Sequence, residues 1–175
     1  MDWRLRRAEP GDAAALSLVA GATFLETFAG VLAGPDIVAH VSTKSSVAGF
    51  DEWIADPVSI ITLAEHPVGD APVGYTVLTT PADVGEPRDG DLELRRIYAL
   101  AVTRGTGLGT ALMARAVDDA RGLGAKRLIL GVLGTNATAC AFYERQRFAQ
   151  VGERRFKVGD AWHDDRVYAR TIEHA

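Results

Sequence analysis

The spacing of apolar and polar residues changes along the chain and predicts both strands and helices. Residues 3–8 alternate partly, as in a strand, and apolar positions recur at helical spacing over residues 13–28. Asp12 stands immediately before this first helix, where we expect it to act as the N-cap. Two further segments, 36–40 and 47–54, have the pattern of one or two short helices.

The remainder of the chain predicts mostly strands, with two longer helices between them. The expected elements are a β-hairpin (58–64 and 72–79), a strand through Glu93, helices at 107–122 and 136–147, a strand at 128–133 and a final strand pair at 150–158 and 162–172. The helix at 107–122 has an apolar stripe that should pack on a sheet, formed by Leu108, Leu112, Ala116, Ala120 and Leu123. Residues 81–91 form a polar loop, but neither side of it looks able to fold alone, so we expect a single domain over residues 1–175.

Composition indicates a globular domain and argues against nucleic-acid and membrane partners. Of the 175 residues, 47% are hydrophobic and 24% are charged, which is typical of a folded chain with a sizeable core. The formal net charge of −4 argues against a general nucleic-acid binder, which normally has a basic face. No apolar run approaches the roughly 18 residues that a membrane-spanning helix needs, so no membrane partner is expected.

Cysteine and histidine usage indicates neither a disulfide nor a metal site. Cys140 is the only cysteine, and the four histidines are scattered through the sequence. The N-terminal residues lack the continuous apolar segment of a signal peptide. We therefore expect a cytoplasmic protein without a bound metal.

Three glycines in five residues, Gly105, Gly107 and Gly109, join the strand through Glu93 to the next helix. Such a turn predicts an anion site, because unpaired backbone N–H groups and the positive end of the helix dipole meet at the helix start. The stretch does not have the pattern of a nucleotide P-loop, and Thr110 stands where the dinucleotide fingerprint needs its last glycine. A turn with a purely structural role is the alternative.

The segment Arg104–Gly109 matches the pattern R/Q-x-x-G-x-G/A, and here the chain resembles the GNAT superfamily of acyl-CoA-dependent N-acyltransferases. The resemblance covers essentially the whole chain and is most specific over residues 91–157. It implies an α/β GNAT fold, with one central mixed, mostly antiparallel, twisted sheet of about seven strands flanked by about four helices. The stretches T-F-L-E-T-F-A-G, E-L-R-R-I-Y, N-A-T-A-C-A-F-Y-E-R and F-K-V-G-D look like a bacterial polyamine-acetyltransferase-like subgroup.

The resemblance also implies an acetyl-CoA site at the glycine turn. In the family this turn holds the pyrophosphate of coenzyme A, a role that falls here to Arg104, Gly105, Thr106, Gly107, Leu108, Gly109 and Thr110. The family's preceding strand pairs its main chain with pantetheine, which implies backbone contacts and a β-bulge at Ile97, Tyr98, Ala99 and Leu100. The family often has glycine where this chain has Arg147, so a local difference is expected at that helix end.

Asn136 and Tyr143 lie seven residues apart, which is two helical turns, and should share one helix face about 10 Å apart along the axis. In resembling enzymes such an Asn binds the pantetheine or phosphate arm of the cofactor, and the Tyr hydroxyl sits beside the thioester sulfur. The leaving group is a thiolate, and a phenol with a pKa of about 10 stays protonated to donate to it. The resemblance thus implies that Tyr143 is a general acid, and a core aromatic is the alternative.

The resemblance also makes Glu93 the candidate general base, acting directly or through water, because some GNAT enzymes place a base carboxylate on this strand at a similar distance before the motif. An acceptor amine with a pKa of about 10.4 must lose a proton before it attacks, and a carboxylate is the usual acceptor of that proton. Glu93 and Arg95 share one face of the strand by alternation, so an ion pair with a neighbouring arginine is the competing interpretation. Phe24 and Phe28 are expected to border the acceptor together with Glu93, with a plain core role as their alternative.

These residues and the resemblance to the GNAT superfamily together imply an acyltransferase that moves acetyl from acetyl-CoA to a primary amine by direct attack in a ternary complex. A small amine or a polyamine is favoured, with aminoglycosides, amino acids and protein N-termini left open. The alternatives are a non-catalytic acyl-CoA-binding or regulatory domain, a protein N-terminal or lysine acetyltransferase, and a nucleotide-binding oxidoreductase. Relatives commonly dimerise, which leaves a homodimer open.

Overall fold

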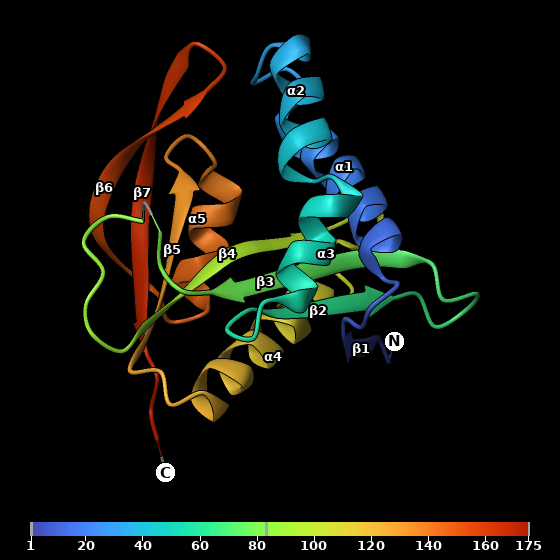
Figure 1. Cartoon of the computed structure of the whole chain (residues 1–175). Coiled ribbons are helices and arrows are strands. Elements are labelled where there is room, and N and C mark those ends of the chain that lie inside the picture. Colours follow the sequence, from blue (N-terminus) through green and yellow to red (C-terminus); the bar gives the residue numbers. More distant parts are fainter. Residues whose placement is uncertain (1, 83, 175) are drawn as a thin grey trace. The chain divides into compact units, whose positions relative to one another are not determined.

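The computed structural model describes residues 2–82 and 84–174, which contain five α-helices, one short 3-10 helix and seven strands (Figure 1). In chain order the elements are β1 (Arg4–Arg7), α1 (Ala13–Phe28), α2 (Gly34–Lys44), α3 (Val47–Ala55), β2 (Ile60–Glu65), β3 (Pro72–Thr79), β4 (Asp91–Ala99), η1 (Ala101–Thr103), α4 (Leu108–Gly122), β5 (Arg127–Leu133), α5 (Ala137–Arg145), β6 (Ala149–Val158) and β7 (Ala161–Thr171). The strands form one mixed sheet in the order β1-β2-β3-β4-β5-β7-β6. The expected α/β fold with about seven strands is confirmed.

Five α-helices are present where about four were expected, because the segment after α1 forms two helices. α2 ends at Lys44, and α3 starts anew after Ser46. The Ser46 hydroxyl accepts a hydrogen bond from the Gly49 N–H at 3.1 Å. A serine in this position satisfies one of the unpaired N–H groups at a helix start. Ser46 therefore acts as the N-cap of a separate helix, α3.

The chain separates into two compact units. Unit 1 contains Met1–Val77 and Arg96–Ala114, and unit 2 contains Leu78–Arg95 and Arg115–Ala175. Strands β3 and β4 and helix α4 each continue from one unit into the other. The expectation of a single domain stays a prediction.

Unit 1 has apolar clusters on both faces of its strands. β1 and β2 pair antiparallel, from Arg4 opposite Glu65 to Arg7 opposite Thr62. On one face, side chains of α1 and α3 pack against alternate strand residues in a cluster formed by Ala13, Leu16, Val19, Ala20, Phe50, Ile61, Leu63, Tyr75 and Val77. The opposite face holds a second cluster of Ala64, Val73, Leu108 and Leu112. Because both faces are covered, β2 is buried along its whole length.

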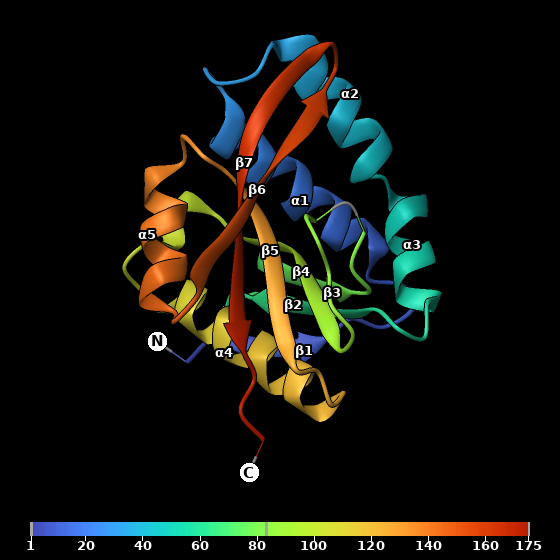
Figure 2. The ribbon, with the colours of Figure 1, turned by 90° about the vertical axis from the view of Figure 1, so that its left-hand side faces the viewer.

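Unit 2 has two antiparallel strand pairs, β5–β7 and β6–β7, beside the parallel pair β4–β5. β7 pairs with β5 on one side and with β6 on the other, and the two final strands form the long hairpin that the sequence predicts (Figure 2). A register shift between Gln150 and Gly152 bends this hairpin. Its turn contains Gly159 at φ +57°, a backbone conformation that glycine adopts at little cost. One apolar cluster of the unit comprises Val84, Ile129, Val167 and Ala169.

A buried ion pair joins the starts of the parallel strands β4 and β5. Asp91 lies opposite Arg127 in the register, and the two guanidinium–carboxylate hydrogen bonds measure 2.9 and 2.6 Å. Burial by itself would raise the pKa of Asp91, but the bonds from Arg127 and from the Arg88 N–H outweigh it and leave the pKa below its usual value. The bidentate geometry fixes how the two strands align.

Three local expectations were wrong. Asp12 precedes α1, but its side chain makes no cap hydrogen bond and instead accepts bonds from Arg6 (2.7 and 2.8 Å) and from the Glu9 N–H. A bidentate, charge-assisted pair with arginine is stronger than a single hydrogen bond to a helix N–H group. The Asp12 carboxylate therefore binds Arg6 instead of capping α1. Leu123 lies beyond the end of α4 and is 52% exposed. The helix expected at 136–147 is shorter, because Asn136 caps it and it ends at Arg145.

Candidate functional site

The glycine turn lies where the sequence predicts it, between the end of β4 and the start of α4. Gly105 and Gly107 have φ values of +76° and +87°, and a Cβ added at either would meet no atom within 4 Å. These glycines are therefore required by the backbone conformation rather than by crowding. Gly109 already belongs to the first turn of α4. The N–H groups at this helix start suit an anion such as a phosphate.

Side-chain hydrogen bonds hold the turn in shape. The Thr103 hydroxyl donates to the Leu100 carbonyl at 2.7 Å, and the Thr106 hydroxyl donates to the Thr103 carbonyl at 2.6 Å. Arg104 stands between them with an exposed side chain, and among the described residues no carboxylate forms an ion pair with it. An unpaired guanidinium beside the helix start is available to an anionic ligand.

The residues of β4 in unit 1 alternate between the two apolar clusters. Tyr98 packs with the cluster beneath α1 and α3 and lies over Tyr75 at a centroid distance of 5.9 Å. Ile97 and Ala99 belong to the opposite cluster, with Leu108 and Leu112. This alternation leaves the backbone of Ile97–Leu100, rather than its side chains, for a ligand. The predicted β-bulge in this stretch stays a prediction.

Glu93 lies in the part of β4 that belongs to unit 2, where the parallel register with β5 covers Asp91–Glu93 opposite Arg127–Ile129. Its side chain is 5% exposed and forms an ion pair with Arg95 at 2.9 Å. The same carboxylate accepts a hydrogen bond from the Ala82 N–H at 3.0 Å. The ion pair that the sequence left open is therefore present, and the role of Glu93 as a base stays a prediction.

Asn136 and Tyr143 lie at the start and in the last turn of α5. The Asn136 Oδ1 accepts a hydrogen bond from the Ala139 N–H at 3.1 Å and so caps the helix. Tyr143 is buried among aromatic rings, with centroid distances of 5.5 Å to Phe142, 6.0 Å to Phe148 and 6.2 Å to Tyr168. The cap uses the carbonyl end of Asn136 and leaves its amide N–H₂ as the group that could donate to a ligand.

The rings of Phe24 and Phe28 lie against each other on one side of α1, tilted by 42°, with ring centroids 4.4 Å apart. His40 of α2 stacks on Phe24 at 4.1 Å and 7°. Burial, and then the positive charges of Arg96 and Lys44, lower the pKa of His40 to about 4, so this imidazole is neutral at pH 7. The expected acceptor-side aromatics are thus joined by a histidine that the sequence analysis did not single out.

Arg96 is a second residue that the sequence did not single out. Its guanidinium lies 4.9 Å from the ring centroid of Trp53 and donates to the Ser45 hydroxyl and to the Lys44 carbonyl, at 3.1 and 2.8 Å. It therefore binds the C-terminal end of α2, where a positive charge is favourable. No local signal indicates this contact, because about fifty residues separate the partners.

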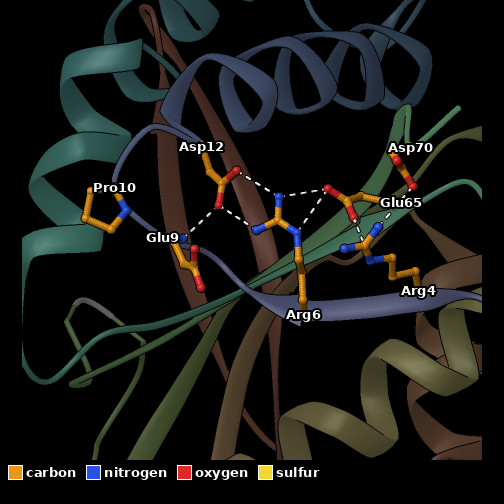
Figure 3. Close-up of a pocket in the computed structure, with 7 residues that line it drawn as sticks. All are labelled: Arg4, Arg6, Glu9, Pro10, Asp12, Glu65 and Asp70. Carbon is orange, nitrogen blue, oxygen red and sulfur yellow. Dashed lines mark hydrogen bonds and ion pairs between the residues drawn. The ribbon is translucent and has the colours of Figure 1, made fainter.

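A charged hollow on unit 1 is a further candidate (Figure 3), lined by Arg4, Arg6, Glu9, Pro10, Asp12, Glu65 and Asp70. Arg6 bridges Asp12 and Glu65 at 2.7 Å to each, and Arg4 bridges Glu65 and Asp70 at 3.4 and 3.2 Å. Two arginines face four carboxylates there, so the hollow has an excess of negative charge. Its ion pairs join β1 to the start of α1 and to the end of β2.

The described residues contain neither a metal-binding group nor a membrane-spanning helix. No group of three or more His, Cys, Asp or Glu side chains in residues 2–82 and 84–174 is arranged to hold a metal ion. None of the helices described there has both the length and the apolar character to cross a membrane.

Comparison with known proteins identifies what the chain resembles. The model of the Acetyltransferase (GNAT) family matches residues 32–148. An uncharacterized N-acetyltransferase of Mycobacterium bovis and one of Mycobacterium tuberculosis are each 34% identical over 161 residues, which cover 92% of this chain and 98% of each relative.

Solved structures show the same fold. A PaiA N-acetyltransferase of Thermoplasma acidophilum in complex with coenzyme A has a TM-score of 0.77 at 18% identity, over 98% of this chain and 99% of that one. YncA of Salmonella typhimurium, a putative acetyltransferase with acetyl-CoA, has a TM-score of 0.69 at 20% identity, over 100% of this chain and 97% of that one. At these identities the likeness concerns the fold alone.

Proposed function

Because the chain belongs to the Acetyltransferase (GNAT) family, whose activity is N-acetyl transfer, we propose that it moves acetyl from acetyl-CoA to a primary amine. The observation that carries the proposal is the glycine turn, where Gly105 and Gly107 adopt positive φ at the start of α4 beside the unpaired Arg104. Open backbone N–H groups, a helix dipole and a free guanidinium form a site for the pyrophosphate of coenzyme A.

The remaining cofactor contacts follow the family pattern. The backbone from Ile97 to Leu100 would pair with the amides of pantetheine, in the manner of an added strand. The Asn136 amide would donate to the same arm. Tyr143 would stand beside the thioester sulfur. We expect the phosphates to lie on the N–H groups between Gly105 and Thr110, except that of Thr106, which donates to the Thr103 carbonyl.

The proposed reaction is a direct attack in a ternary complex. The neutral amine attacks the thioester carbonyl, so a C–N bond forms and the C–S bond breaks without an acyl-enzyme. Tyr143 protonates the leaving thiolate, because a phenol retains its proton at neutral pH and can donate it as the sulfur departs. The proton lost by the amine goes to Glu93, directly or through water. The ion pair with Arg95 competes with the incoming proton for the Glu93 carboxylate.

The acceptor is proposed to be a small amine or a polyamine, bordered by Phe24, Phe28 and Glu93. The half-buried rings of Phe28 and His40, which pack on the buried Phe24, would offer an apolar surface to the carbon chain of such an amine. The polyamine-acetyltransferase-like motifs support a substrate with more than one amino group. Turnover of acetyl-CoA against a panel of amines, including polyamines, amino acids and a peptide N-terminus, separates these acceptors.

Binding of acetyl-CoA is the direct test of the proposal. A ligand that binds only the folded protein raises its melting temperature, so acetyl-CoA should do so while NAD and NADP should not. Arg104→Ala should raise the acetyl-CoA Kd about tenfold, and the difference should shrink with added salt. Arg88→Ala, at another exposed arginine, is the matched control. The proposal fails if acetyl-CoA produces no shift, or if it binds while no amine in the panel is acetylated.

A further inference from the structure

The carboxylate of Glu26 makes a hydrogen bond that no expected role explains. Glu26 lies in the last turn of α1, and its Oε2 accepts a bond from the Ala101 N–H at 2.8 Å, across 75 residues of sequence. Ala101 begins η1, the short helix between the end of β4 and the glycine turn. The bond therefore joins the helix of the acceptor-side aromatics, Phe24 and Phe28, to the turn on the cofactor side.

The direction of the Ala101 N–H shows which edge of β4 this bond lies on. The preceding N–H, that of Leu100, donates to the Val73 carbonyl of β3 at 2.9 Å. Successive N–H groups of extended backbone point to opposite edges, so the Ala101 N–H points away from β3. By the same alternation, the N–H groups of Ile97 and Ala99 point to this second edge. Glu26 thus binds the last donor of the edge along which pantetheine is expected.

The position of Glu26 is not one that helix stability favours. A negative charge near the C-terminal end of a helix interacts unfavourably with the helix dipole. Glu26 is also exposed, so its side chain contributes little to the core of unit 1. The glycine turn is already folded by short-range bonds, such as those from Arg104 N to the Ala101 carbonyl and from the Thr103 hydroxyl to Leu100. Loss of the Glu26 bond should therefore shift the turn without unfolding it.

We propose that Glu26 is a positioning residue for acyl-CoA, because its carboxylate fixes the point at which the edge of β4 ends and the phosphate-binding turn begins. This inference rests on the proposed function of that turn. Glu26 acts through the backbone of Ala101 and takes no proton from the substrate. Its removal weakens acetyl-CoA binding and leaves the chemical step and the fold nearly unchanged.

The test compares three variants by calorimetric titration with acetyl-CoA, by steady-state kinetics and by thermal unfolding. Glu26→Ala should raise the Kd and KM for acetyl-CoA about 5- to 10-fold, with kcat within about threefold of wild type. Its melting temperature should change by less than about 3 °C. Glu26→Gln retains a carbonyl oxygen that can accept the Ala101 N–H, so it should restore the Kd to within about threefold. Glu52→Ala, at an exposed acid on α3, should match wild type.

Two outcomes overturn the inference. One is an acetyl-CoA Kd of Glu26→Ala equal to that of wild type. The other is a loss confined to kcat, which would mean that Glu26 acts on the reaction rather than on cofactor placement. Failure of the proposed function gives a different result, since wild type itself would then either show no acetyl-CoA binding or bind acetyl-CoA without acetylating any amine in the panel.

Discussion

Tyr143 and Tyr168 lie side by side in unit 2, with ring centroids 6.2 Å apart, and both are buried. The Tyr168 hydroxyl donates to the Glu144 carboxylate at 3.0 Å. Burial, together with this carboxylate and the Cys140 thiol, raises the pKa of Tyr168 even though Arg166 acts in the opposite direction. Tyr168 is therefore held as a neutral phenol by its own network. The pair offers two chemically identical side chains, only one of which has a proposed catalytic role.

Removal of the Tyr143 hydroxyl should abolish most of the activity. Tyr143→Phe is expected to lower kcat by about 10²- to 10⁴-fold, the usual contribution of a general acid, with little change in acetyl-CoA affinity. Tyr168→Phe is the matched control and should keep kcat, while the lost bond to Glu144 lowers the free energy of unfolding by about 1–2 kcal/mol. Steady-state kinetics and urea unfolding of both variants provide the comparison. Equal kcat losses in the two variants would contradict a general-acid role for Tyr143.

Arg147 occupies a position that suits glycine. It follows α5 at φ +66°, and the bonds Arg147 N to Glu144 O and Phe148 N to Tyr143 O form a Schellman motif. The Tyr143 and Phe148 rings make the apolar contact that often accompanies this motif. Arg147 itself adopts the left-handed conformation that glycine would take. The residue difference expected at this helix end therefore does not change the path of the backbone.

Arg147→Gly should for this reason stabilise the protein. Glycine removes the strain energy of the left-handed conformation, and this gain exceeds the entropy cost of its greater flexibility in the unfolded chain. The free energy of unfolding should therefore rise by about 0.5–1 kcal/mol. Arg145→Gly, inside the last turn of α5, should instead destabilise by about 0.5–1 kcal/mol. Chemical denaturation measures both changes. A loss of stability in Arg147→Gly would show that the arginine side chain makes a larger contribution than its backbone strain.

The sequence predicted those features that depend on local spacing. The stripe from Leu108 to Ala120, the apolar run at Leu128–Leu133 and the glycine turn each depend on neighbours a few residues apart, and each lies in its expected element. Asn136 shows an intermediate case. Asparagine is a preferred N-cap, so its position before α5 instead of inside it could have been predicted from residue type alone.

The contacts that escaped prediction join distant elements. Arg96 packs on Trp53, His40 stacks on Phe24 and Glu26 binds Ala101, and none of these pairs follows from periodicity. Each depends on how α1, α2 and α3 pack on the strands of unit 1. The spacing of apolar residues predicts which face of a helix packs on the sheet. It does not predict which distant residue a charged or aromatic side chain will contact, because that depends on how the helices are finally placed.

Gly74 of β3 makes the closest backbone approach beside the expected pantetheine strand. A Cβ at this position would lie 2.9 Å from the Tyr98 carbonyl oxygen and 3.3 Å from the Ala99 Cα. Gly74→Ala must therefore shift the β4 backbone, at a cost of about 1–3 kcal/mol in the free energy of unfolding. Because the shift falls on Tyr98 and Ala99, we also expect weaker acetyl-CoA binding. Gly122→Ala, where an added Cβ meets no atom within 4 Å, is the control for both measurements. Equal acetyl-CoA affinity in the two variants would argue against a cofactor role for this stretch.

The pair of Arg6 and Asp12 should make stability depend on pH in the acid range. The hydrogen bonds from Arg6 hold the pKa of Asp12 below its usual value, against the opposing effect of burial. A carboxyl whose pKa is lowered on folding adds stability above its unfolded pKa of about 3.9, and that stability is lost as the pH falls through the folded value. Asp12→Asn should therefore unfold about 1–2 kcal/mol more easily at pH 7, with a smaller difference at pH 3.5.

Asp70→Asn provides the comparison for this pH dependence. Asp70 also pairs with an arginine, at 3.2 Å from Arg4, but its side chain is 62% exposed. An exposed pair contributes little, so this variant should stay within about 0.5 kcal/mol of wild type. Urea unfolding between pH 7 and pH 3.5 measures the difference between each variant and wild type. The stability difference between wild type and Asp12→Asn depends on pH only through the charge on Asp12. If this difference is the same at both pH values, the Arg6 bonds do not stabilise the ionised carboxylate.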